Sequence, residues 1–201
     1  MAVKKLKLSF DPNSLQQVLA ANLSVVITKQ TINQSNTVVW LVFRPFLTNE
    51  VSWEDQFELY ASQIRNHEVT EMITTSADPG KRYIFQESGF ILSDEPGVLG
   101  GFQIANETDR TWTMGILQTA QINGTSSQNM ISSEIVPPRM LNEIVPLEIL
   151  EVFMMSGPNP GDKVEGAVNT VRGHAIRLTF GGAIDSISIR YNPKLGMFVR
   201  V

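Results

Sequence analysis

The alternation of apolar and polar positions is clearest between Asn36 and Ala61, a stretch that holds two of the three tryptophans. From residue 50 to residue 61 one face is apolar and the other polar, as in a strand with one buried face. The odd positions are Val51, Trp53, Asp55, Phe57, Leu59 and Ala61, and the even positions are Glu50, Ser52, Glu54, Gln56, Glu58 and Tyr60. Residues 38–43 are apolar throughout, which predicts a strand covered on both sides. Because Pro45 cannot donate a backbone hydrogen bond and lies between these runs, we predict a long central hairpin.

Similar but shorter patterns predict strands over most of the remaining chain. They span residues 4–10, 23–29, 68–75, 83–86, 90–93, 102–105, 112–122, 131–136, 147–155, 164–171, 175–180, 184–191 and 197–201. The sequence NETDR is predicted to join residues 102–105 and 112–122 as a pair, and INGTS predicts a tight hairpin. Short strands separated by Gly, Pro and Asn are typical of an antiparallel sandwich or barrel.

One helix is expected after the first strand. Asp11 is a suitable N-cap, Pro12 fits the first helical position, and Asn22 suits the left-handed residue that ends a helix. An apolar stripe formed by Leu15, Val18 and Leu19 would face the core. The predicted fold class is therefore all-β, an antiparallel β-sandwich with one short N-terminal helix. We expect a single domain over residues 1–201, with a candidate boundary between halves 1–95 and 96–201 at the sequence DEPGVLGG.

Composition removes several classes of function. With 42% hydrophobic residues, 18% charged residues and a formal net charge of -4, the chain has no basic footprint for nucleic acid. It has no cysteine, which excludes disulfides and thiolate chemistry and fits a reducing compartment. The first ten residues lack the apolar core of a secretion signal, and no run of eighteen apolar residues occurs. We expect a soluble cytoplasmic protein without a transmembrane segment, and release without a leader stays open as an alternative.

Catalytic motifs are scarce. The two histidines, His67 and His174, lie in polar or turn sequences and are expected to be solvated. No nucleophile elbow, HExxH, Walker A or dinucleotide-binding fingerprint occurs. The loops NPGDKVEG and DEPG offer acids beside backbone carbonyls, but neither has EF-hand spacing and both are interpreted as turns. We predict no enzyme activity, no cofactor and no metal.

The sequence WEDQFE carries the sharpest catalytic alternative. Glu54 and Glu58 share one strand face and resemble the ExDxE strand of jelly-roll glycoside hydrolases, although Gln56 replaces the middle acid. Four residues of extended strand separate the two backbones by about 13 Å, so a carboxylate dyad would need a bulge. Asp55 is an acid on the apolar face, which requires either a partner such as Arg44 or a position where the strand leaves the core.

Aromatic residues next to polar ones provide candidate binding positions. Trp112 follows Asp109 and Arg110, a combination of a flat ring with hydrogen-bonding groups that suits sugars and lipid head-groups, although a core tryptophan fits the same pattern. The predicted ligand-binding residues are Asp109, Arg110, Trp112, Glu54 and Glu58. A Phe-Met-Met run at residues 153–155 fits either a sandwich core or an exposed partner surface.

The second half of the chain contains GGFQIANETDRTWTMGI, IVPP, VEGAV, AIRLTF and SISIRYN. This half resembles the β-sandwich of actinoporins and fungal fruit-body lectins, which place an Asn-rich turn before a tryptophan strand. The resemblance implies a compact sandwich that binds lipid head-groups or sugars. The chain departs from actinoporins in two places, because GGAIDS lacks their aromatic cluster and the short helix follows a strand.

The leading expectation is a non-enzymatic binding protein that recognises a glycan or a lipid head-group through the loops of its sandwich. Two alternatives remain. One is a membrane-active, pore-forming toxin, and the other is a self-assembling structural or storage protein, which the low charge and the edge strands favour. A homo-oligomer is compatible with each.

Overall fold

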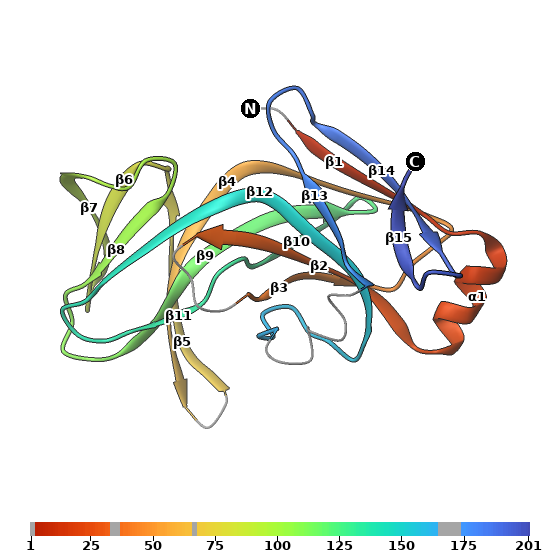
Figure 1. The fold of residues 1–201 in the computed structure, drawn as a ribbon. Coiled ribbons are helices and arrows are strands. Elements are labelled where there is room, and N and C mark those ends of the chain that lie inside the picture. Colours follow the sequence, from red (N-terminus) through yellow and green to blue (C-terminus); the bar gives the residue numbers. More distant parts are fainter. Residues whose placement is uncertain (1–2, 33–36, 66–67, 165–173) are drawn as a thin grey trace.

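A computed structural model describes residues 3–32, 37–65, 68–164 and 174–201, which form fifteen strands and one helix. The strands lie in two sheets, so the all-β, sandwich-like fold with one short helix is confirmed. Long strands run along the molecule, with the helix α1 (Pro12–Ala20) at one end and a group of shorter strands at the other (Figure 1). His67 and most of the strand predicted at 164–171 lie outside the described residues.

The first sheet is built around β4 (Thr48–Arg65) and β9 (Trp112–Ile122). Its order is β10 (Thr125–Met130), β9, β4, β1 (Lys4–Ser9), β14 (Ser186–Asn192) and β15 (Met197–Arg200), with β11 (Glu134–Val136) on β9 and β5 (Glu68–Ala77) on β4. The ladder between β1 and β14 is parallel, whereas the other ladders of this sheet are antiparallel.

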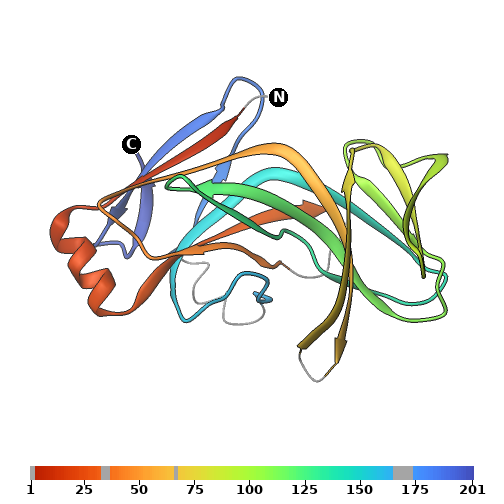
Figure 2. The ribbon, with the colours of Figure 1, turned by 180° about the vertical axis from the view of Figure 1, so that it is seen from behind.

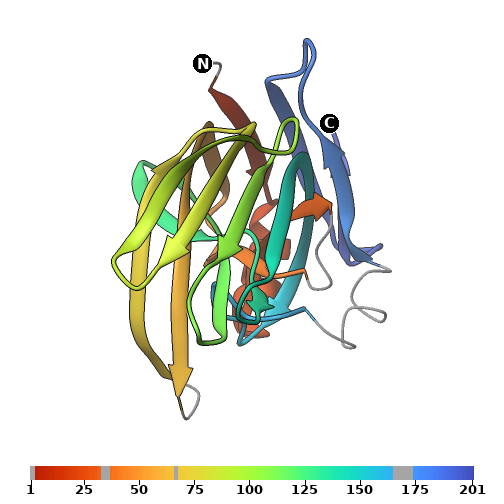
Figure 3. The ribbon, with the colours of Figure 1, turned by 90° about the vertical axis from the view of Figure 1, so that its left-hand side faces the viewer.

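The second sheet is built around β12 (Leu141–Ser156). Its order is β3 (Val39–Phe43), β2 (Leu23–Ile32), β12, β8 (Phe102–Asn106), β6 (Lys81–Gln86) and β7 (Gly89–Pro96), with β13 (Ile176–Thr179) on β12. The β6–β8 ladder is parallel. Viewed from its end, the molecule presents β6, β7 and β8 in front of the longer strands (Figure 3).

The predicted helix is confirmed as α1 (Pro12–Ala20). The Asp11 carboxylate accepts a hydrogen bond from the Ser14 backbone N–H at 3.0 Å, which satisfies one of the free donors of the first turn. Asn22 follows the helix with a φ of 52°, the left-handed conformation expected at its end. The hairpin predicted at INGTS is also present, because Asn123 and Gly124 join β9 to β10 with φ angles of 52° and 83°.

The central hairpin prediction is wrong. Both strands exist, but β3 pairs with β2 in the second sheet, whereas β4 pairs with β1, β5 and β9 in the first. The connection turns from one sheet to the other, and the Asn49 side chain bonds both the N–H and the C=O of Phe46 within it. The predicted pairing of residues 102–105 with 112–122 is wrong for the same reason, since β8 and β9 lie in different sheets.

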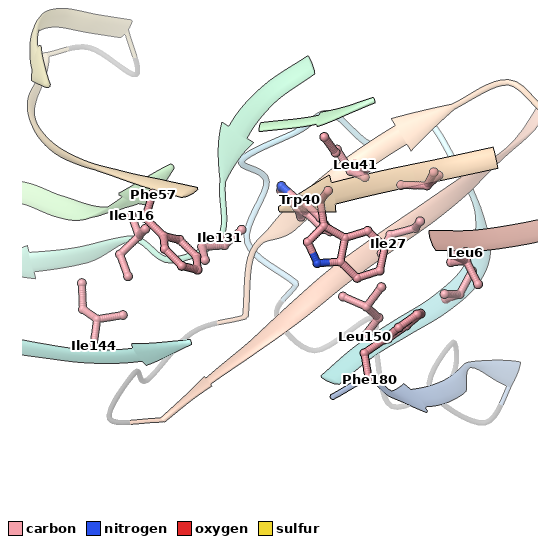
Figure 4. Packing of buried hydrophobic residues seen from close by; sticks show 14 of the residues in the cluster. Leu6, Ile27, Trp40, Leu41, Phe57, Ile116, Ile131, Ile144, Leu150 and Phe180 are labelled. Atoms are coloured by element: carbon pink, nitrogen blue, oxygen red, sulfur yellow. The ribbon is translucent and has the colours of Figure 1, made fainter. Parts of the chain in front are cut away.

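A continuous apolar core lies between the sheets, and Figure 4 shows part of it. Aromatic rings link the layers: Trp53 lies edge-on to Trp40 at 5.7 Å between ring centroids, and Phe57 to Phe102 at 5.5 Å. A smaller cluster of Val26, Val39 and Phe153 covers the other face of β2, β3 and β12. This second cluster explains why the run 38–43 is apolar on both faces, and it places Phe153 in a buried environment.

Candidate functional site

A bulge interrupts the pairing of β4 with β9. Trp53 lies opposite Ala120 and Phe57 opposite Gln118, so residues 54–56 of β4 face Thr119 alone. Bulges bend a strand and redirect its side chains, and they often occur beside binding sites. This bulge turns the acidic stretch of β4 toward two neighbouring surface clefts.

The larger feature, which we call the β4 cleft, has a volume of about 290 Å³. Its lining comes from β4, β5, β9, β10 and the residue after β5: Asp55, Gln56, Phe57, Glu58, Ser76, Ala77, Asp78, Leu117, Thr119 and Gln128. A second cleft of about 280 Å³ shares Gln56 and Thr119 with it and adds Glu54. Two of the predicted ligand-binding residues, Glu54 and Glu58, therefore line clefts on the two sides of the bulge.

Side-chain amides hold these two carboxylates. Gln56 Nε2 donates to Glu54 Oε2 at 3.2 Å, and Gln128 Nε2 donates to Glu58 Oε1 at 2.9 Å. The second contact joins β10 to β4 across the strand that lies between them, so the Glu58 carboxylate is oriented at the cleft wall. A carboxylate has more acceptor positions than one amide uses, which leaves Glu58 able to accept from a ligand.

Asp55 has a buried partner, but the partner is Lys4 and not Arg44. Lys4 Nζ lies 2.6 Å from each carboxylate oxygen of Asp55, whose side chain is 44% exposed. Lys4 itself is buried and also lies 3.5 Å from Glu148. The proposed pairing with Arg44 is therefore wrong, while the expectation that Asp55 lies where the strand leaves the core agrees with its half-exposed position.

Behind the cleft wall lies a fully buried lysine, Lys29 of β2. Its side chain is 0% exposed, and its Nζ donates to Glu148 Oε1 at 2.5 Å and to Gln118 Oε1 at 2.9 Å. Rings surround it, with centroids 5.6 Å away for Trp40, 5.9 Å for Trp53 and 5.7 Å for Phe57. Burial lowers the pKa of the Lys29 amine, and the carboxylate of Glu148 opposes that effect.

These contacts connect the interior to the cleft. Glu148 accepts from Lys29 and from Trp53 Nε1, the latter at 3.0 Å, and its other neighbour Lys4 holds Asp55 at the cleft wall. Gln118 bonds Lys29 with its oxygen and donates its Nε2 to the Glu54 carbonyl oxygen at 2.8 Å, within the bulge. The bulge is thus supported from inside by a hydrogen-bonded charged network, and such support fixes the geometry of a surface site.

The network residues Lys4, Lys29, Gln118 and Glu148 were not predicted as functional. For two of them a signal existed, because the alternation of β1 and of β2 places Lys4 and Lys29 on the inward faces. Glu148 lies at an irregularity in the pairing of β12 with β2, between Pro146 and Leu150. No local pattern in the sequence marks this position.

The other three predicted residues do not line either cleft. Trp112 is only 2% exposed, stacks edge-on against Phe85 and donates its Nε1 to Thr108 Oγ1 at 3.1 Å. Asp109 lies on the surface, 3.1 Å from Arg139, and Arg110 lies 4.0 Å from Glu87. Trp112 therefore occupies a core position, the second of the two alternatives for its pattern.

Other chemistry is sparse in the described part of the chain. His174 is exposed, with its Nδ1 3.2 Å from the Leu195 carbonyl oxygen. Among the described residues, no three or more His, Cys, Asp or Glu side chains are grouped so as to hold a metal ion. Nor does any helix in the described ranges have the length and apolar character needed to cross a membrane.

Comparison of the chain with protein-family models, with curated proteins and with solved structures finds no match.

Proposed function

We propose that this chain is a non-enzymatic binding protein that holds a hydroxyl-rich ligand, a glycan or the polyol head-group of a lipid, in the β4 cleft. The observation that carries the proposal is the bulge, beside which carboxylates, amides and hydroxyls from four strands line one open cleft together with Phe57, Ala77 and Leu117. Sugars are recognised by such planar acceptors and donors combined with an apolar surface.

The charge of the cleft favours a ligand rich in hydrogen-bond donors. Three carboxylates line it, from Asp55, Glu58 and Asp78, and no lysine or arginine does. Lys4 compensates Asp55 from behind, so the acceptor groups face the cleft while the compensating cation is buried. A ligand with several hydroxyl groups matches this arrangement, because each carboxylate oxygen accepts more than one hydrogen bond.

The lining also supports binding over catalysis. It includes no histidine, cysteine or lysine, and its hydroxyl groups, from Ser76 and Thr119, have no histidine beside them in the lining to act as a base. The side chains of Glu54 and Glu58 belong to different clefts, although both clefts share Gln56. This separation argues against the Glu54–Glu58 dyad in particular, because two carboxylates that act on one glycosidic bond must face the same reacting group.

The first experiment is a glycan array with the full chain, followed by calorimetric titration of any glycan that binds. Because Glu58 would accept a charge-assisted hydrogen bond, Glu58→Gln should weaken the affinity about tenfold. A matched control is Asp94→Asn, which removes an exposed carboxylate on β7 that lines neither cleft. The control should leave the affinity unchanged.

A parallel arm uses vesicles that carry a glycolipid or an inositol lipid, so that the two sources of a polyol are separated. Binding to the free glycan alone identifies a sugar ligand, and binding that needs the vesicle identifies a head-group. The proposal is overturned if neither arm gives binding, or if Glu58→Gln and Asp94→Asn have the same affinity as the parent protein.

A further inference from the structure

A second surface, at the end of the molecule that carries α1, is apolar where the β4 cleft is polar. A groove of about 440 Å³ runs between α1 and the connection from β3 to β4. Its lining is Leu15, Leu19, Arg44, Pro45, Phe46, Leu47 and Thr48. Phe46 is 63% exposed and Leu47 48% exposed, so two adjacent large apolar side chains face solvent here. We call this surface the α1 tip.

The exposed residues of the tip lie on a braced loop. The buried Asn49 side chain accepts from the Phe46 N–H and donates to the Phe46 C=O, both at 2.9 Å. The Phe10 N–H donates to the Leu47 carbonyl oxygen at 2.9 Å. These contacts fix the backbone from both sides, so binding through the two side chains requires little ordering of the backbone.

Basic residues flank the tip. Arg44 lines the groove itself. Ser9 of β1 lies between Thr48, which lines the groove, and Arg190 of β14. Lys7 precedes Ser9 by two residues and so points to the same face of β1. Thr48 also lines a neighbouring groove of about 470 Å³ that contains Lys7 and Glu50, so the apolar and basic surfaces meet at this residue.

The three cations, Lys7, Arg44 and Arg190, are exposed, and none of them is held in an ion pair with any of the residues that the structure describes. Against these three cations stand two exposed carboxylates, Glu50, which lies opposite Lys7 in the register of β1 with β4, and the N-cap Asp11. The helix α1 itself contains no charged residue. The surface therefore combines exposed apolar side chains with a local excess of positive charge on a chain whose formal net charge is -4.

We propose that the α1 tip docks on an anionic lipid surface, with Phe46 and Leu47 entering the interface and Lys7, Arg44 and Arg190 facing the head-groups. Apolar side chains beside basic ones are the combination that binds membrane interfaces. The helix α1, which forms one wall of the tip, lies at one end of an elongated molecule (Figures 1 and 2), so the tip is accessible to a surface that approaches this end. This inference is independent of the β4 cleft.

A lipid surface fits the tip better than a protein partner does. A stable protein interface buries roughly 800 Å² on each side, and most of that area must be closely complementary. The apolar part of the tip consists of four leucine and phenylalanine side chains, two of them already half-buried against the molecule. Insertion of a few side chains into a fluid interface needs no matching shape, and the excess of cations over carboxylates supplies the remaining attraction.

The test is co-sedimentation of the full chain with vesicles of phosphatidylcholine, with and without phosphatidylserine. We expect binding only with phosphatidylserine, and weaker binding as salt is added. The double variant Phe46→Ser with Leu47→Ser should weaken binding roughly tenfold or more, because both apolar side chains are lost from the interface. Arg44→Gln and Lys7→Gln should each weaken it roughly fivefold.

Two control variants match these changes away from the tip. Leu99→Ser removes an apolar side chain that is 95% exposed, and Lys81→Gln removes an exposed cation of β6. Both should bind vesicles as the parent does. If the double serine variant is misfolded by circular dichroism, the Arg44→Gln comparison with Lys81→Gln decides the question.

Three results would overturn the proposal. One is no sedimentation of the parent with phosphatidylserine vesicles. Another is equal binding by the tip variants and their controls. The third is a dimer, seen by light scattering, that the double serine variant abolishes while vesicle binding stays unchanged, since the tip would then bind a second copy of the chain.

Discussion

Two groups of charged side chains in this molecule have similar chemistry and opposite surroundings. In the interior, Lys29 is fully buried and is held by Glu148 and by ring faces. On the surface, Arg139 spans Glu107 at 2.7 Å and Asp109 at 3.1 Å, but its side chain is 62% exposed. Water solvates the surface charges whether or not they are paired, whereas Lys29 has only the protein. Ion pairs of similar length therefore have very different consequences when one partner is removed.

The largest effect is expected at Glu148. Glu148→Ala leaves a buried ammonium without its carboxylate and Trp53 Nε1 without its acceptor, so the free energy of unfolding should fall by about 3–5 kcal/mol. Urea denaturation followed by tryptophan fluorescence measures this loss. Glu148→Gln keeps an acceptor oxygen and should lose less.

The double variant Lys29→Met with Glu148→Leu tests whether the loss in Glu148→Ala comes from the unpaired buried charge. It removes the buried charge together with its partner, so it should recover much of the stability that Glu148→Ala loses. If Glu148→Ala is as mild as a surface substitution, or if the double variant is less stable than Glu148→Ala, the account of the buried network is wrong.

A smaller, pH-dependent effect is expected at Tyr60, another buried polar group of the interior. Burial raises the pKa of the Tyr60 hydroxyl to about 12, and the hydroxyl donates to the Ser132 carbonyl oxygen at 3.0 Å. The unfolded chain ionises near the ordinary value of 10.0, so the stabilisation is complete below that pH and is lost as the pH rises to about 12. The shift corresponds to about 3 kcal/mol.

The effect of Tyr60 is isolated by comparing the unfolding free energies of the parent and of Tyr60→Phe between about pH 9 and about pH 12. At the lower of these pH values tyrosine is still protonated. The lowered pKa of Lys29 has the opposite effect, since it makes the protein more stable as the pH rises toward 10.5, the ordinary pKa of lysine. This contribution is the same in both proteins and therefore cancels in the difference. Parallel curves for the two proteins would show that Tyr60 does not titrate as described.

The smallest effect is expected at Arg139. Ion pairing with Glu107 and Asp109 raises the pKa of its guanidinium, yet all three groups remain in contact with water. Arg139→Ala should therefore leave the midpoint of urea unfolding close to that of the parent, and added salt should remove any residual difference. A shift as large as that of Glu148→Ala would show that the surface network is structural.

Local backbone conformation was readable from the sequence, and the reasons are visible in single residues. Asp11 and Asn22 bound α1 because a cap and a left-handed stop depend only on nearby groups. The alternation in β4 placed Trp53 and Leu59 inward, since a strand alternates whatever it pairs with, but Tyr60, expected on the polar face, is buried as well.

Strand partners were not readable in the same way. Residues 39–43 and 48–65 are neighbours in the chain, yet they pair in different sheets, because hydrophobic pattern records which face is buried and not which strand lies alongside. The same limit applies to the parallel ladders of β1 with β14 and of β6 with β8.

The bulge at the candidate site does not disturb the alternation of apolar and polar residues in β4. Between matched pairs, β4 advances four residues, from Trp53 to Phe57, while β9 advances two, from Ala120 to Gln118. The difference of two is even, so the inward and outward positions continue in register through the bulge. Sequence reasoning therefore found Glu54 and Glu58 but not the shape of the clefts that they line.

The parallel ladder of β1 with β14 has a consequence for synthesis on the ribosome. Lys5 pairs with Ser186, and Ser9 with Arg190, so one edge of β1 has no partner until residues 186–190 have been translated. The other edge can pair earlier, with residues 48–53 of β4. Closure of contacts so distant along the chain is slow, and unpaired edges invite aggregation meanwhile. This edge of β1 therefore stays unpaired in a nascent chain until residues 186–190 have been synthesised.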